Sequence, residues 1–117
     1  MNEREQQRNN GLLSAMPELQ YDIHKWRKKN FPNATSDQMI KGVMEELGEL
    51  ARADLKLEQN IRTNEDHEEK MWDAIGDMCI FLMGYCSYKE LDFMSCIINA
   101  WDEVQQRDWQ KNKENGK

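Results

Sequence analysis

Apolar residues recur every three or four positions along much of the chain, which is the spacing of one face of an α-helix. The clearest stripe lies in residues 36–57 and consists of Ile40, Val43, Met44, Leu47, Leu50, Ala51 and Leu55. A second stripe lies in residues 92–110 and consists of Phe93, Cys96, Ile97, Ala100, Trp101 and Val104. Residues 78–83 are apolar without interruption, which is typical of a helix segment buried on every side.

Proline and capping residues set the bounds of the first two helices. The first helix is predicted to start near Ser14, with Pro17 in its first turn, and to end before Pro32, because a proline pushes the preceding residue out of the helical region. Residues 35–38 (TSDQ) have the pattern of a capping box. A second helix is therefore expected from there to about Leu57.

The second half of the chain predicts two further helices. The polar segment 58–66 lacks helical periodicity and is expected to be a loop. A third helix should follow it to about Tyr88, and a fourth should run from about Asp92 to Gln110.

Strands have little support, because the chain has only two prolines, six glycines and no Asn-Gly or Asp-Gly hairpin turn. We therefore expect an all-α fold, and four helices with short connections predict a bundle. The expected organisation is a frayed or disordered leader, a helical domain and a polar tail, over residues 1–12, 13–110 and 111–117.

Length and charge narrow the classes of partner. The 117 residues are enough for one domain, and 16 Lys and Arg against 22 Asp and Glu give a net charge of −6. An acidic chain disfavours nucleic acid and anionic membranes as partners. The longest apolar run is far shorter than the roughly 20 residues that span a bilayer. The polar N-terminal sequence predicts a cytoplasmic protein, in which Cys79, Cys86 and Cys96 are expected to be reduced core residues.

Two glutamates of the second predicted helix lie beside small residues. At 100° per residue, Gly42, Glu46, Glu49 and Ala53 gather on an arc next to the apolar stripe, whereas Glu45 lies farther round. A solvated arc more usually carries long polar side chains. The small neighbours therefore indicate that another part of the structure or a ligand approaches this arc closely.

The third predicted helix carries acids at every fourth position, Glu69, Asp73 and Asp77, and these share one face. Two helices that each present carboxylates near a buried segment can bind a divalent cation between them. Oxygen ligands without His or Cys favour Mg²⁺ or Mn²⁺. From spacing alone, the alternative of ordinary solvent-facing acids is the stronger of the two interpretations.

Aromatic and cationic residues cluster in residues 25–29 (KWRKK), with Phe31 just after, and again in residues 107–109 (RDW). Such clusters can stack on a base and hold its phosphates. Taken alone, the first cluster favours the alternative that Trp26 packs in the core and the lysines are solvated. Trp72 and Trp101 are also predicted to pack in the core.

Residues 45–50 (EELGEL) and 73–77 (DAIGD), on consecutive predicted helices, resemble the EExxE and ExxD motifs of MazG-like all-α nucleoside triphosphate pyrophosphohydrolases. The resemblance extends from about Tyr21 to Trp109. It implies a MazG-like bundle completed by oligomerisation, as a homodimer or homotetramer with active sites near helix interfaces. It also implies a metal-dependent enzyme that cleaves a nucleoside triphosphate into the monophosphate and pyrophosphate.

The resemblance also implies the metal ligands. Glu46 and Glu49 match the first motif and Asp77 matches the end of the second, all as ligands of Mg²⁺, with Mn²⁺ as a second choice. Ala74 stands where the family has the glutamate of ExxD, so Asp73 beside it is the expected replacement ligand. Glu45 or Glu49 is the candidate general base.

The remaining site residues also come from the resemblance. Trp26 and Phe31 are expected to contact the base and sugar, and Lys29, Asn99 and Arg107 the phosphates. The alternative function is a catalytically silent MazG-like scaffold that binds a nucleotide or a protein, which the departure at Ala74 favours. A third interpretation is a structural helical bundle whose acidic stripe is solvated.

Overall fold

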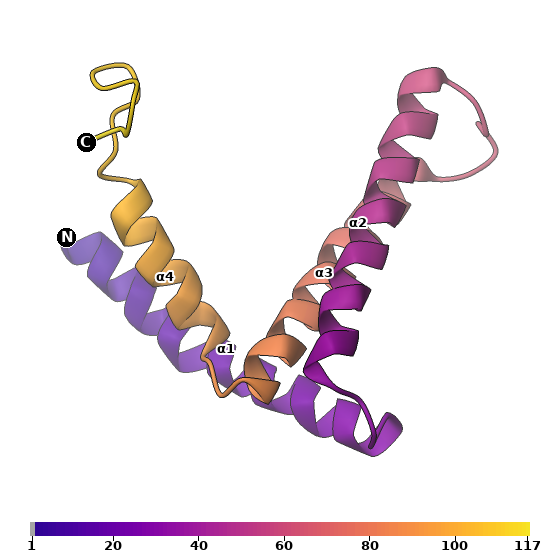
Figure 1. Cartoon of the computed structure of the whole chain (residues 1–117), viewed down its shortest axis with the longest axis horizontal. Coiled ribbons are helices and arrows are strands. Elements are labelled where there is room, and N and C mark those ends of the chain that lie inside the picture. Colours follow the sequence, from indigo (N-terminus) through magenta and orange to yellow (C-terminus); the bar gives the residue numbers. More distant parts are fainter. Residues whose placement is uncertain (1) are drawn as a thin grey trace.

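The computed structural model describes residues 2–117, which form four α-helices and, over that range, no β-strand. The helices are α1 (Glu3–Asn30), α2 (Ser36–Gln59), α3 (His67–Tyr88) and α4 (Phe93–Val104), shown in Figure 1. The predicted all-α fold is confirmed. No helix in residues 2–117 is both long enough and apolar enough to cross a membrane.

Helix α1 begins much earlier than predicted, so the predicted start near Ser14 is wrong. The Asn2 side chain accepts a hydrogen bond from Glu5 N–H at 2.8 Å and caps the helix, and acidic side chains occupy its first turn. Pro17 lies well inside the helix. The N-terminal part of α1 packs along α4 (Figure 1), and this tertiary contact is not visible in a local pattern.

The predicted bounds of α2 and α3 are close to the observed ones. Thr35 accepts a hydrogen bond from Gln38 N–H at 3.3 Å and donates its own N–H to Gln38 Oε1 at 3.2 Å, which confirms the capping box. Asn60 ends α2 in the left-handed conformation. Asp66 then caps α3, which ends at Tyr88 as predicted.

Helix α4 is shorter than predicted, because it stops at Val104 and not near Gln110. The following chain turns back on itself. Asp108 N–H donates to Gly116 O, and Gly116 adopts a φ of 75° that other residues rarely take. The end of the chain is therefore folded in turns against Arg107 and Trp109.

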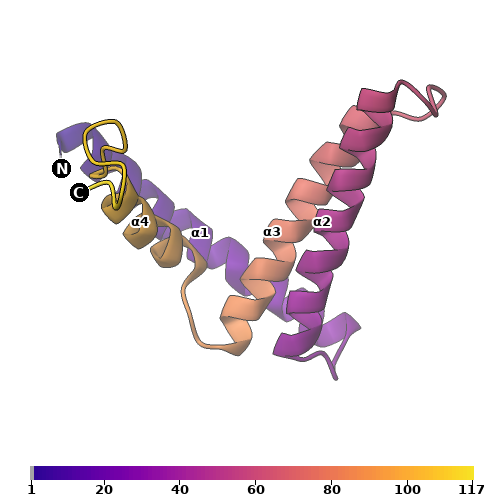
Figure 2. The same cartoon turned by 45° about the horizontal axis from the view of Figure 1, so that its top comes forward.

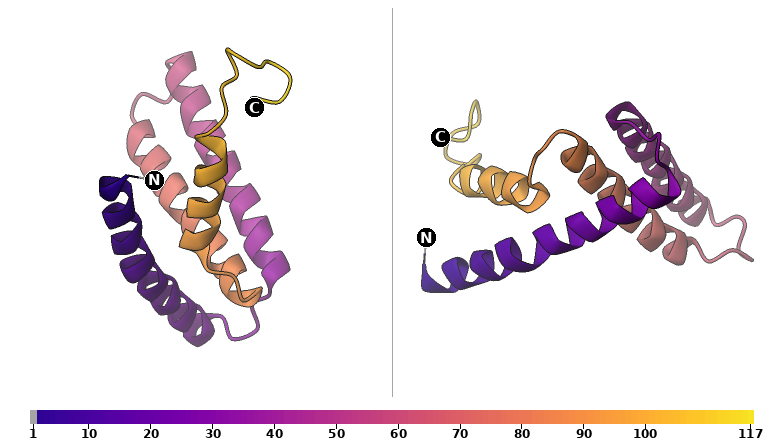
Figure 3. Two further views of the ribbon diagram at one scale, coloured as in Figure 1. Left: turned by 90° about the vertical axis from the view of Figure 1, so that its left-hand side faces the viewer. Right: turned by 90° about the horizontal axis from the view of Figure 1, so that it is seen from below.

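The four helices form a V and do not close into one bundle. Helices α2 and α3 pair antiparallel in one arm, and α4 lies antiparallel to the N-terminal part of α1 in the other (Figures 1 and 2). Seen from below, α1 runs beneath both arms (Figure 3). The radius of gyration is 17.8 Å, whereas a compact chain of this length has about 13 Å.

Buried Gln20 joins α1 to the α3–α4 connection at the base of the V. Its amide donates to Ser87 Oγ at 3.2 Å and to Leu91 O at 3.0 Å. Its carbonyl oxygen accepts from Phe93 N–H at 2.9 Å. These three hydrogen bonds hold the connection that sets the position of α4 relative to α3.

Two glycines fix how α2 and α3 pair. A Cβ on Gly42 would overlap the Phe81 ring, and a Cβ on Gly84 would overlap the Met39 sulfur. Moving three residues forward on α2 therefore matches three residues back on α3. Four residues beyond Gly42 on α2 and four before Phe81 on α3, the same register places Glu46 opposite Asp77.

The face of α2 that packs on α3 is the small-residue arc and not the apolar stripe. Gly42 and Ala53 are buried, which confirms that a close neighbour approaches this arc, and the neighbour is α3. Most of the predicted inner stripe is exposed on the opposite side of α2, at Ile40, Met44, Leu47, Ala51 and Leu55.

Several other residues that were predicted to lie in the core are also exposed. On α4, Met94 is buried, whereas the predicted inner positions Cys96, Ile97, Ala100, Trp101 and Val104 are exposed. Trp72 is 75% exposed. Of the cysteines only Cys86 is buried, and all three are free thiols.

Candidate functional site

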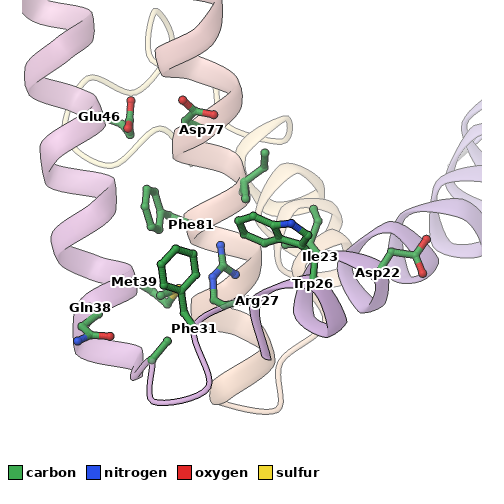
Figure 4. A pocket seen from close by; sticks show the side chains of 12 residues that line it. Asp22, Ile23, Trp26, Arg27, Phe31, Gln38, Met39, Glu46, Asp77 and Phe81 are labelled. Carbon is green, nitrogen blue, oxygen red and sulfur yellow. The ribbon is translucent and has the colours of Figure 1, made fainter. Parts of the chain in front are cut away.

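A cavity of about 690 Å³ lies where the C-terminal part of α1 meets the first half of α2 and the middle of α3. This volume is within the usual range of small-molecule sites. Figure 4 shows its lining: Asp22, Ile23, Trp26, Arg27, Phe31, Ala34, Gln38, Met39, Glu46, Asp77, Ile80 and Phe81. Four of the predicted site residues are among them, namely Trp26, Phe31, Glu46 and Asp77.

The acidic end of the cavity is formed by Glu46 of α2 and Asp77 of α3, which face each other across the helix pair (Figure 4). Each lies one helical turn beyond the Gly42–Phe81 contact. Burial raises the pKa of Glu46, and the negative charges of Asp77, Glu45 and Glu49 raise it further. The carboxylates near the acidic end therefore repel one another.

Within residues 2–117, no cation forms an ion pair with these two acids. In the described part of the chain the ion pairs are Arg52–Glu65, Lys70–Glu65 and Arg107–Glu103, at 3.8, 3.3 and 3.1 Å, all outside the cavity. A divalent cation fits the donor set at the acidic end, because Mg²⁺ is commonly held by one or two carboxylates together with water and substrate phosphates. Residues 2–117 contain no group of three or more His, Cys, Asp or Glu arranged to hold a metal.

The other predicted acids lie outside the cavity. Glu45, Glu49 and Asp73 are exposed and do not line it. The α2–α3 register places Glu49 at the level of Ala74, which is 2% exposed and packed between the helices. Asp73 is the exposed neighbour of this buried position, so its side chain does not take the place that a glutamate at position 74 would have.

The opposite end of the cavity is aromatic. The Trp26 and Phe31 rings are 5.9 Å apart at 65°, an edge-to-face contact, and Phe81 lies across from them (Figure 4). Trp26 is 54% exposed, so the interpretation that it packs in the core is wrong. These rings form an apolar wall that is open to a ligand.

The predicted phosphate contacts do not reach this cavity within one chain. Lys29 is exposed near the end of α1 and does not line the cavity. Asn99 is exposed on α4, in the other arm of the V. Arg107 pairs with Glu103 at 3.1 Å and lies 6.0 Å from the Trp109 ring centre.

Sequence reasoning missed the other eight lining residues, which are Asp22, Ile23, Arg27, Ala34, Gln38, Met39, Ile80 and Phe81. Arg27 could not be distinguished from the lysines beside it, because a run of cations is usually solvated. Its spacing contained a signal, because Arg27 and Phe31 are four residues apart and thus share one side of the chain as it leaves α1.

Comparison with models of protein families, with curated proteins and with solved structures finds no match to this chain.

Proposed function

We propose that this protein is a metal-dependent nucleoside triphosphate pyrophosphohydrolase of the MazG-like type. The observation that carries the proposal is the pairing of Glu46 with Asp77 at one end of a cavity whose other end is aromatic. An acid pair can hold a cation against phosphates, and the aromatic wall can hold a base. One cavity thus offers a place for both parts of a nucleotide.

In this proposal Glu46 and Asp77 hold Mg²⁺, or Mn²⁺ in its place. When bound, the ion would supply neutralisation of the phosphate charge and a lowered pKa of its bound water. Glu49 and Asp73, which do not line the cavity, remain candidate ligands from the resemblance alone, and Glu45 or Glu49 remains the candidate base that orients or deprotonates the attacking water. Trp26 and Phe31 contact the base and sugar.

The decisive experiment measures pyrophosphate release from ribo- and deoxynucleoside triphosphates with Mg²⁺, Mn²⁺ or EDTA. We expect metal-dependent release that Asp77→Asn and Glu46→Gln abolish while the circular dichroism spectrum is unchanged. Asp54→Asn, an exposed acid of α2 outside the cavity, is the matched control and should keep full activity. Full activity in both cavity variants would show that the site assignment is wrong.

A second candidate function is binding of a nucleotide or a protein without turnover. It is favoured by Ala74, which puts a methyl group where the resemblance calls for a carboxylate. In that case Mg²⁺ raises the melting temperature of the wild type by mass action but no pyrophosphate appears. The third interpretation, a solvated acidic stripe, predicts no thermal shift with either metal.

We also propose that the chain works as a homodimer or homotetramer. Its accessible surface is 8996 Å². A compact protein of 13.9 kDa has about 6,700 Å², so the chain exposes about 2,300 Å² more than expected. Obligate dimers bury from about 1,000 to 2,500 Å² on each partner, which matches this surplus.

The apolar residues on the outside of α2 are the centre of the proposed contact, since Met44 is 67% and Leu47 is 55% exposed. A second copy also gives Asn99 and Arg107 a route to a cavity that they do not line in their own chain. Mixing an Asp77→Asn chain with an Arg107→Ala chain tests this route, because mixed assemblies then contain one intact site and recover part of the activity.

A further inference from the structure

Arg27 is a buried cation that forms no ion pair with another residue in the range 2–117. It is 3% exposed, and its Nη1 atom has no hydrogen-bond acceptor within residues 2–117. Its guanidinium lies 5.7 Å from the centre of the Phe81 ring, between that ring and the Trp26 indole (Figure 4). Burial also lowers the pKa of this group, which reflects the cost of keeping it charged away from water.

The acids of the cavity do not neutralise this charge. Asp22 points away from Arg27 in Figure 4. Arg27 lies against Gly84, which is seven residues from Asp77 along α3, or about 10 Å along the helix axis. A guanidinium in such a position costs stability unless something that enters the cavity supplies acceptor atoms.

The surroundings of Arg27 define that partner. Trp26, Phe31 and Phe81 offer ring faces and edges, and Met39 offers a thioether, so a flat aromatic group fits this end better than a hydrated phosphate. The guanidinium is a planar fork that favours two acceptors side by side. The occupant is therefore a base with two adjacent acceptors on one edge.

Resting on the proposed function, we infer that Arg27 selects the base of the nucleotide, and that it favours guanine, whose O6 and N7 atoms form such an edge. Adenine presents an amino donor next to N7, which opposes the guanidinium donors. Uracil has a donor between its two carbonyls. Cytosine has adjacent acceptors at N3 and O2, so it belongs to the favoured class by the same chemistry.

The test measures binding of GMP, CMP, AMP and UMP to the full chain in EDTA, so that neither metal nor turnover enters the result. We expect GMP or CMP to bind at least about tenfold more tightly than AMP and UMP, as a bidentate pair provides. In Arg27→Met the ratio of these affinities, GMP or CMP over AMP or UMP, should fall to near one. Lys25→Met, an exposed cation two residues away, should keep the wild-type ratio.

The melting temperature separates selection from a structural role. Because Arg27→Met keeps an apolar stem and removes an unpaired buried charge, its unliganded melting temperature should equal or exceed that of the wild type. If this variant does not fold, Arg27→Lys keeps the charge without the fork and should also lose the ratio. A lower melting temperature with the ratio retained would mean a structural cation and would overturn the inference.

Two other results would also overturn it. Equal weakening of all four ligands in Arg27→Met would identify a phosphate contact, and absence of binding or of base preference in the wild type would leave Arg27 without this role. Selective binding without pyrophosphate release from any triphosphate would instead refute the proposed enzyme and leave the inference intact. Pyrophosphate release together with an unchanged base preference in Arg27→Met would refute the inference on Arg27 and leave the proposed enzyme intact.

Discussion

The side chain of Gln20 accepts a hydrogen bond from Phe93 N–H at 2.9 Å and so ties the long first helix to the first residue of α4. The same amide donates to Leu91 O and Ser87 Oγ. One buried side chain thus satisfies the backbone at the tightest connection of the V, between α3 and α4.

Gln20→Ala should lower the free energy of unfolding by about 1–3 kcal/mol, because it leaves the part-buried Leu91 carbonyl and Phe93 N–H without their partner. Urea unfolding followed by circular dichroism gives this value. Gln7→Ala, on an exposed position of the same helix, should change it by less than about 0.5 kcal/mol. Similar stabilities for the two variants would mean that water replaces Gln20 without cost.

Gly42→Ala should destabilise the protein by about 1–3 kcal/mol, because the new methyl group overlaps the Phe81 ring. Gly48→Ala is the matched control on the same helix, with no atom within 4 Å of the added Cβ. It should stabilise by roughly 0.5–1 kcal/mol through helix propensity. If thermal unfolding shows that Gly42→Ala lowers the stability and Gly48→Ala raises it, the α2–α3 register is supported. Changes of the same sign in both variants would contradict it.

The raised pKa of Glu46 predicts a particular pH dependence. Where a carboxyl binds its proton more tightly in the folded state, stability falls as the pH rises above the ordinary value of 4.5 towards the folded pKa. In EDTA, Glu46→Gln should therefore be more stable than the wild type near neutral pH, and the difference should shrink as the pH falls below that window.

Urea unfolding of both proteins between pH 4 and pH 8 checks this dependence. Glu58→Gln, at an exposed position outside the cavity, should follow the wild type at each pH. A Glu46→Gln protein that is less stable than the wild type at pH 7 would contradict the assigned charge repulsion.

Leu47→Glu should convert the proposed assembly into monomers, because it puts a charge in the middle of the exposed apolar face of α2. Light scattering after size-exclusion chromatography gives the mass directly. Lys41→Glu changes a charge elsewhere on α2 and should leave the assembly intact. A wild type that is monomeric at all concentrations would contradict the proposal.

Local signals in the sequence predicted the helices well and their packing poorly. The capping box at Thr35 depends on a few neighbouring residues, so it could be identified directly. The early start of α1 has a local signal, the cap at Asn2, which the prediction overlooked, whereas its contact with α4 joins segments far apart in the sequence. Helix α4 ends early where the residues after it fold back, with Asp108 N–H donating to Gly116 O.

The site was predictable to the extent that it follows helical spacing. Glu46 and Asp77 could be paired because both lie on acidic arcs, whereas Arg27 could not be distinguished from its solvated neighbours. The apolar stripe of α2 misled the packing prediction for a physical reason. Periodicity shows that Leu47 belongs to an apolar face, but it does not show whether the same chain covers that face.

Helix α2 carries Glu46 of the acid pair on one side and the exposed apolar stripe on the other, so both sides of this helix are proposed to bind a partner. Because one helix contributes to both surfaces, nucleotide binding at one surface is thermodynamically linked to assembly at the other. If nucleotide tightens the contact between copies by some factor, assembly must tighten nucleotide binding by the same factor. The affinity of the cavity would then depend on how dilute the protein is.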